Sequence, residues 1–185
     1  MFRDMALYLR DWYLSPAFVS QDLIDDEDRN SLALAGILFG IVAILAFQVL
    51  YVVLSGIPLN FTQFIVAILY VAFMFALDVI FLEIATSITN TMVSLGENMA
   101  IAAFVSTTSI FSLPAVPIVV YVPAINNMYI LLFLMLPHVF YLLTSLKGIT
   151  EKSWLALLGT SILSLVLIFI FFAVGVFAHV LFFNF

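Results

Sequence analysis

The side chains that can do chemistry are few, and they lie inside or at the ends of long apolar stretches. Asp78 and Glu83 belong to the stretch that begins at Phe61, and His138 lies near the middle of the stretch from Tyr129 to Leu146. An ionisable side chain within a membrane span is costly and usually faces the bundle interior or water. Asp78 and His138 therefore form the candidate intramembrane polar site, where Asp78 can hold a proton or an ion. The alternative is that Asp78 is a structural acid, bonded to neighbouring hydroxyls or kept protonated.

The spacing of these residues does not predict a paired acid/base site. Glu83 lies near the end of its stretch, where we expect the membrane interface, and five residues of helix turn it more than about 100° away from Asp78. A proton relay between His138 and Asp78 is possible, but a rise of about 1.5 Å per residue predicts depths that differ by about 10 Å. Since His138 follows Pro137, we expect it to satisfy a carbonyl that the proline leaves without its helical hydrogen bond.

Other chemistry-bearing patterns are missing from the sequence. Cys is absent, which excludes disulfides, iron–sulfur clusters and thiolate metal sites. The acidic run from Asp22 to Asp28 lacks the alternating ligands and central glycine of an EF-hand loop. There is no P-loop, nucleophile elbow or HExxH motif, and no basic cluster for nucleic acid. We therefore expect no enzymatic activity, no cofactor, no metal site and no nucleic-acid partner.

These residues belong to a chain with the composition of an integral membrane protein. Of its 185 residues 66% are hydrophobic and only 9% are charged, and the mean hydropathy is +1.30. Each apolar stretch can cross a hydrocarbon core, which takes about 20 helical residues. The stretches are Leu32–Leu54, about Phe61–Leu82, Ala100–Val122, Tyr129–Leu146 and Trp154 to about Phe182. With short connections between antiparallel neighbours, they predict an all-α, polytopic transmembrane helical bundle of about five spans in residues 31–185.

Residues 1–30 are expected to form a cytoplasmic amphipathic and acidic segment. Phe2, Met5, Leu9 and Trp12 recur at helical spacing, which predicts a short amphipathic interfacial helix that stops at Ser15 and Pro16. A frayed, solvated tail is the alternative. The acidic run that follows is expected to be solvated and to cap the first span. The segment lacks the apolar core and small-residue cleavage site of a signal peptide.

Positive charge predicts the orientation in the membrane. Five spans place all five basic residues on one side, and these are Arg3, Arg10, Arg29, Lys147 and Lys152. By the positive-inside rule, the N-terminus is cytoplasmic and the C-terminus lies on the far side.

Two features predict how the spans are shaped. Gly36 and Gly40 make a small-xxx-small step that serves close helix contact, either inside the bundle or in a dimer. Pro114 and Pro117 predict a helix break, so the third span is kinked or partly unwound. Broken helices form substrate sites in transporters, and they also serve plain packing.

The order of several short motifs resembles the Yip1-domain family. They are Phe104-Val105-Ser106-Thr107, the region of Pro114 and Pro117, Tyr141-Leu142-Leu143, Leu146-Lys147-Gly148-Ile149, and the opening Tyr13-Leu14-Ser15-Pro16-Ala17-Phe18. The sequence has neither the DLxGP-type motif nor the Tyr-Gly pair of the eukaryotic branch, so it is most similar to the prokaryotic branch. The resemblance implies a cytoplasmic N-terminal segment followed by five spans, and a prokaryotic cytoplasmic membrane as the location.

The leading hypothesis is a non-enzymatic accessory or scaffold protein of Yip1-like type. Its partners would be the lipid bilayer and other integral membrane proteins, or further copies of itself. The alternative is a small transporter or channel subunit in which Asp78 and His138 line a polar path. An intramembrane enzyme would need polar groups that converge at one depth, and the sequence pattern supplies no such set.

Overall fold

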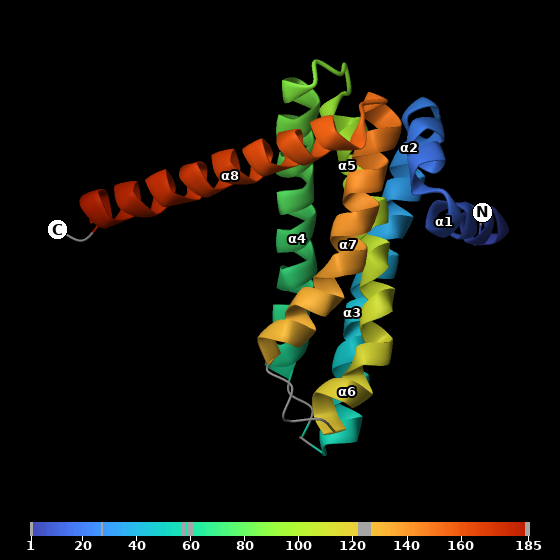
Figure 1. Cartoon of the computed structure of the whole chain (residues 1–185). Coiled ribbons are helices and arrows are strands. Elements are labelled where there is room, and N and C mark those ends of the chain that lie inside the picture. The colour runs from blue at the N-terminus through green and yellow to red at the C-terminus, as the bar shows by residue number, and fades with distance from the viewer. Residues whose placement is uncertain (1, 27, 57, 59–60, 122–126, 184–185) are drawn as a thin grey trace.

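The computed structural model describes residues 2–26, 28–56, 58, 61–121 and 127–183 (Figure 1). Across this part of the chain every regular element is helical, as the composition predicts. The elements are α1 (Phe2–Leu14), α2 (Pro16–Asp25), α3 (Arg29–Ser55), α4 (Phe61–Ile88), α5 (Leu95–Ser106), the 3-10 helix η1 (Thr107–Ala115), α6 (Val116–Tyr121), α7 (Asn127–Thr150) and α8 (Trp154–Phe183).

Several of these helices are long and apolar enough to cross a membrane. Three such segments occur among the described residues, namely Arg29–Ser55, Phe64–Ile88 and Leu95–Ile118. A fourth is added if Met135–Thr150 and Trp154–Ile170 count together as one bent span. The fold is therefore that of an integral membrane protein with about three to four candidate spans.

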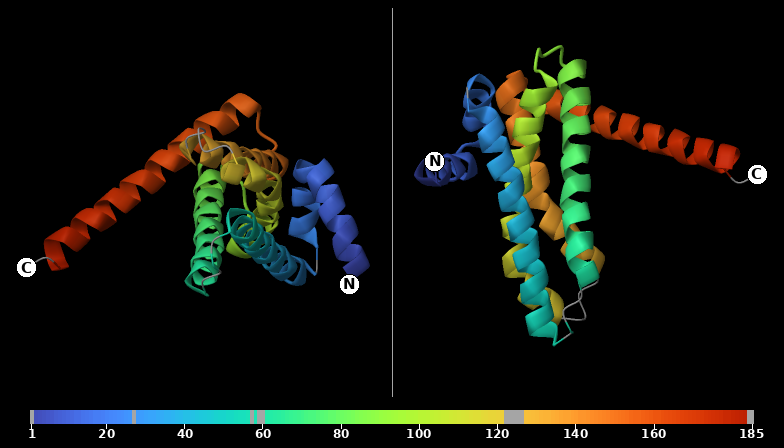
Figure 2. Two further views of the ribbon diagram at one scale, coloured as in Figure 1. Left: turned by 90° about the horizontal axis from the view of Figure 1, so that it is seen from below. Right: turned by 180° about the vertical axis from the view of Figure 1, so that it is seen from behind.

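The bundle consists of α3, α4, α7 and the broken helix formed by α5, η1 and α6 (Figures 1 and 2). The contact between α3 and α5 depends on two glycines. A Cβ added at Gly36 would lie 2.9 Å from the Ala103 carbonyl oxygen, and one added at Gly40 would lie 2.9 Å from that of Ser106. Glycine allows this approach because it has no side chain. The sequence predicted that Gly36 and Gly40 serve close helix contact either inside the bundle or in a dimer. In the structure they make the contact inside the bundle.

The broken span has a physical cause in its sequence. The helix α5 ends at Ser106, and the chain continues as 3-10 helix to Ala115 with Pro114 inside it. Proline has no N–H and its ring crowds the carbonyl one turn earlier, which opposes an α-helix there. The Thr107 and Thr108 hydroxyls also donate to the carbonyls of Phe104 and Val105, at 2.6 and 2.7 Å. The second proline, Pro117, lies in the first turn of α6, where a missing N–H costs nothing.

The N-terminal helices pack against the bundle. Trp12 of α1 is 0% exposed, with its ring 5.3 Å from Phe104 and 6.2 Å from Tyr141. The helix α2 was not predicted, because Pro16 was interpreted only as the end of α1. Pro16 is in fact in the first turn of α2, a position that suits its fixed φ angle. A Cβ on Gly148 of α7 would overlap the Ala17 backbone, so α2 and α7 lie in direct contact.

The last helix differs from the predicted arrangement. We expected the segment from Trp154 to pack antiparallel to its predecessor, but α8 turns by 116° from α7 and leaves the bundle on the side opposite α1 (Figures 1 and 2). Glu151 ends α7 in a left-handed conformation, with φ of 54°. The buried face of α8 against the bundle consists of Leu157 and three small polar residues, Thr160, Ser161 and Ser164. The rest of its described surface is apolar, so the chain's own packing holds α8 along that one stripe.

Candidate polar site inside the bundle

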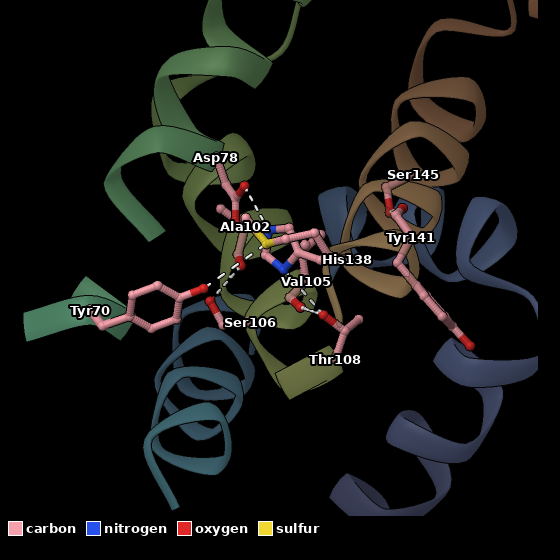
Figure 3. A network of polar contacts seen from close by, with 10 residues as sticks. Tyr70, Asp78, Ala102, Val105, Ser106, Thr108, His138, Tyr141 and Ser145 are labelled. Carbon is pink, nitrogen blue, oxygen red and sulfur yellow. Dashed lines mark hydrogen bonds and ion pairs between the residues drawn. The ribbon is translucent and has the colours of Figure 1, made fainter. Parts of the chain in front are cut away.

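Three polar side chains from three elements meet in the bundle interior (Figure 3). The His138 Nε2 atom of α7 lies 3.0 Å from Oδ1 of Asp78 on α4. The other ring nitrogen, Nδ1, lies 3.2 Å from Oγ1 of Thr108 in η1. The two candidate residues that the sequence singled out are therefore in direct contact, and Thr108 extends them into a chain of hydroxyl, imidazole and carboxyl groups.

The predicted depth difference of about 10 Å between Asp78 and His138 was wrong. The error came from the helix ends, because α4 continues beyond Leu82 to Ile88 and α7 beyond Leu146 to Thr150. Asp78 lies ten residues before the end of α4, and His138 twelve residues before the end of α7. Both helices end on the same side of the bundle, so a difference of two residues is about 3 Å of depth.

The role expected for His138 was also wrong. We predicted that it satisfies a backbone carbonyl near Pro137, but both of its ring nitrogens face the side chains of Thr108 and Asp78. Thr108 was not singled out from the sequence. The signal that could have found it is the hydroxyl-rich run Ser106-Thr107-Thr108-Ser109, which lies just before the prolines that break the span.

The site is buried. Asp78 is 3% exposed and Thr108 is 4% exposed, and the His138 side chain is 12% exposed. The second carboxyl oxygen, Oδ2 of Asp78, is buried and has no hydrogen-bond partner among the described residues. Tyr70 lies on the same helix, and its hydroxyl is 4.0 Å from the sulfur of Met135. An isolated charge would be costly in these surroundings, so the site favours a state without net charge.

Glu83 does not join this site. Its Oε1 accepts a hydrogen bond of 2.8 Å from the Asn98 amide, near the end of the bundle where Arg29 pairs with Glu97 at 2.9 Å. The capping box of α5 uses the same Glu97, whose other oxygen accepts from the Ser94 backbone. These contacts give Glu83, Arg29 and Glu97 partners at the end of the bundle. Glu83 therefore lies apart from Asp78, as the spacing predicted.

The chain of groups has the order seen in nucleophilic catalysis, but its geometry does not activate Thr108. The Thr108 hydroxyl donates to the Val105 carbonyl at 2.7 Å, so its hydrogen is not directed at the imidazole that would act as the base. A nucleophile must also reach a substrate, and Thr108 is 4% exposed. No group of three or more metal-ligating side chains suitable for a metal ion was found in the described part of the chain. The geometry suits storage of a proton better than attack on a substrate.

The N-terminal segment contacts the backbone beside the site. The Tyr13 hydroxyl donates to the Thr107 carbonyl at 3.0 Å, and the Tyr141 hydroxyl donates to the Tyr13 carbonyl at 2.8 Å. Burial raises the pKa of Tyr13, which keeps its hydroxyl protonated as a donor. Tyr13 therefore ties α1 to both η1 and α7, next to the residues that hold the polar chain.

A hollow opens beside the site but does not contain it. It has a volume of about 330 Å³ and is lined by Phe111, Leu136, Pro137, Phe140 and Tyr141. Its lining is apolar, so it suits a lipid chain or an apolar side chain better than water or an ion.

Comparison with family models, with curated proteins and with solved structures finds no match to this chain.

Proposed function

We propose that this chain is a non-enzymatic accessory or scaffold protein of Yip1-like type with five membrane spans. It acts by packing against other integral membrane proteins, or by organising the membrane around them. Its N-terminal segment faces the cytoplasm and its C-terminus the far side. In this proposal α8 is the fifth span, and its outward surface is the contact for the partner.

The observation that carries the proposal is the surface of α8. Its described outward residues are large and apolar, and they are more than two-fifths exposed: Leu155, Leu158, Ile162, Leu163, Leu165, Val166, Leu167, Phe169 and Ile170. Each such side chain gains about 1.5–3 kcal/mol when it is fully removed from water. A surface of this kind requires lipid or another helix around it, and α8 offers it outside the bundle of its own chain.

The arrangement of charge supports the proposed orientation. Arg29 begins α3, Lys147 lies in the last turn of α7, and Glu97 lies in the first turn of α5. These three helix ends lie at the same end of the bundle (Figure 1). Basic residues gather on the cytoplasmic side of membrane proteins, so this end is assigned to the cytoplasm.

The test is the mass and composition of the native particle, extracted gently from membranes through a tag on the N-terminus. We expect a stoichiometric complex with at least one other membrane protein. Replacing Ile162 and Phe169, which are 64% and 75% exposed on α8, with alanine should release the partner. The matched control replaces Val66 and Leu69, which are 58% and 62% exposed on α4. A monomer without a partner, in mild detergent and in the presence of native lipid, would contradict the proposal.

One observation favours a second candidate function, a small transporter or channel subunit. Asp78 and His138 are 3.0 Å apart in the bundle interior, and intramembrane pairs of this kind occur in proton pathways. In that function, purified protein in sealed vesicles would carry a proton or solute flux that Asp78→Asn abolishes. Absence of flux in vesicles that contain correctly folded protein would leave the accessory function as the better proposal.

A further inference from the structure

The hydrogen-bond geometry around Thr108 limits where its hydrogen can be. The Thr108 Oγ1 atom lies 2.7 Å from the Val105 carbonyl oxygen. A carbonyl can only accept, and two oxygens at this distance repel each other unless a hydrogen lies between them. The single hydrogen of the hydroxyl is therefore donated to Val105. Thr108 can then only accept from His138, whose Nδ1 must carry a proton.

The proton on His138 Nδ1 determines how many protons the contact between His138 Nε2 and Asp78 holds. With Nδ1 protonated, a neutral His138 has a bare Nε2, which needs a donor. The 3.0 Å contact to Asp78 must then hold one proton, either on the carboxyl or on the imidazole. In both arrangements the pair has no net charge. The unpartnered Asp78 Oδ2 favours the neutral acid, because an unpartnered oxygen costs less on a neutral carboxyl than on a carboxylate.

A second state is reached by turning one hydroxyl. If Thr108 rotates its hydrogen from the Val105 carbonyl to His138 Nδ1, that nitrogen becomes an acceptor. The imidazole then donates from Nε2 to an Asp78 carboxylate, and the pair holds one proton fewer. Every donor still has an acceptor, so the loss of the proton breaks no helix contact. This state has two costs. It places a negative charge on a side chain that is 3% exposed, and it gives up the hydrogen bond to the Val105 carbonyl, so Thr108 Oγ1 must move away from that oxygen as its hydrogen turns.

We propose that Asp78, His138 and Thr108 form a buried binding site for one exchangeable proton, with the Thr108 hydroxyl as the rotor that accompanies its uptake and release. The titratable side chains around the site are tyrosines: Tyr70 on α4, Tyr141 one turn beyond His138 on α7, and Tyr13 of α1, which bonds the neighbouring Thr107. No charged group contacts the trio among the described residues. The site does not depend on the accessory function proposed above.

The test is nitrogen NMR on the full chain in lipid bilayers, with histidine labelled by ¹⁵N and a pH series from mildly acidic to mildly alkaline. The chain has two histidines, so the variant His179→Gln assigns the signals of His138. We expect Nδ1 to carry a proton at neutral pH and to become bare in one single-proton step as the pH rises. Nε2 keeps its hydrogen bond throughout.

Thr108→Val and Thr108→Ser are the matched variants. Valine leaves the Nδ1–H without an acceptor in the proton-loaded state, and a buried unpaired N–H costs more than a bare ring nitrogen. We therefore expect the step to move down by about one pH unit, which is about tenfold in proton affinity. Serine keeps the hydroxyl and should leave the step in place. Circular dichroism checks that each variant retains its helices.

Three results would overturn the proposal. The first is a bare Nδ1 at every pH, since Thr108 would then be a fixed donor. The second is a protonated Nδ1 with no step across the range, since the proton would then not exchange. The third is an unchanged step in a folded Thr108→Val variant. If the valine variant fails to fold, the wild-type series and Thr108→Ser still decide between a site that releases its proton and a fixed structural pair.

Discussion

At the scale of single residues, the molecule combines an apolar interior with one polar pair that depends on both partners. Asp78 loses its hydration on burial, and the contact with His138 compensates only part of that loss. Removing one partner leaves the other buried and unpaired. Removing both also removes the free-energy cost of burying a polar group without a partner. We therefore expect that the effects of substitutions at Asp78 and His138 on the free energy of unfolding are strongly coupled.

The first prediction tests this coupling. We expect His138→Leu to lower the free energy of unfolding by about 3 kcal/mol, because Asp78 is left unpaired. The double variant Asp78→Leu/His138→Leu should recover most of that loss, since leucine needs no hydrogen bond. Reversible unfolding in mixed micelles of the wild type, Asp78→Leu, His138→Leu and the double variant measures the cycle. Additive losses in the double variant would mean that the pair is not coupled.

The second prediction concerns Tyr8, whose hydroxyl is buried without a partner among the described residues. Burial, together with the negative charges of Asp26 and Asp22, raises the pKa of Tyr8 from 10.0 to about 12. The folded protein therefore holds the tyrosine proton more tightly than the unfolded chain does. The contribution of Tyr8 to stability is fully present below pH 10 and declines as the pH rises towards about 12.

The variant Tyr8→Phe has no proton to lose at this position. We expect it to be at least as stable as the wild type at neutral pH, because the change removes a buried hydroxyl that has no partner among the described residues. Between about pH 10 and 12 it should lose less stability than the wild type, as followed by thermal unfolding. Identical stability profiles for the two proteins across this window would contradict the assignment.

At the scale of elements, hydropathy predicts where helices are but not how they meet. The stretches Leu32–Leu54 and Trp154 to about Phe182 correspond closely to α3 (Arg29–Ser55) and α8 (Trp154–Phe183). A continuous apolar run is lipid-compatible on every side, so it does not tell which face contacts a neighbour. The direction of α8 was for that reason not predictable from its own sequence.

The polar site shows the same limit. The residue types of Asp78 and His138 marked them as candidates, since ionisable groups are rare in apolar runs. Their contact depends on where α4 and α7 end, and both helices continue into polar residues that hydropathy assigns to loops. The partner Thr108 could not be chosen from among four adjacent hydroxyl residues, because the choice depends on the 3-10 geometry of η1.

The third prediction concerns the contact between α3 and α5. Gly36→Ala places a Cβ 2.9 Å from the Ala103 carbonyl, so the two helices must separate, and we expect a loss of about 1–3 kcal/mol. Gly159→Ala is the matched control, because a Cβ there meets nothing within 4 Å. Helix propensity should make the control neutral or more stable by about 0.5–1 kcal/mol. Equal effects of the two substitutions on thermal unfolding in micelles would show that α3 does not rest on α5 through Gly36.

At the scale of the whole molecule, the main question is whether α8 crosses the membrane or lies along its surface. It contains 30 residues and no charged side chain between Trp154 and Phe183. A helix that lies in the interface needs one polar or charged face towards the headgroups. The small polar stripe of α8 faces the bundle, so the outward surface of its described side chains, up to Ile170, has no such face.

The fourth prediction follows from that surface. At about 1.5 Å per residue α8 is about 45 Å long, which exceeds the hydrocarbon thickness of about 30 Å. We therefore expect α8 to turn at residues 151–153 until it crosses the bilayer, which places the two chain termini on opposite sides. Reporter fusions at each terminus, one active only in the cytoplasm and one active only outside it, measure the two locations. A C-terminal reporter that behaves like the N-terminal one would mean that α8 stays on the cytoplasmic side. Its apolar surface would then have to be covered by a partner protein, because headgroups and water cannot cover it without a cost of about 1.5–3 kcal/mol for each large side chain.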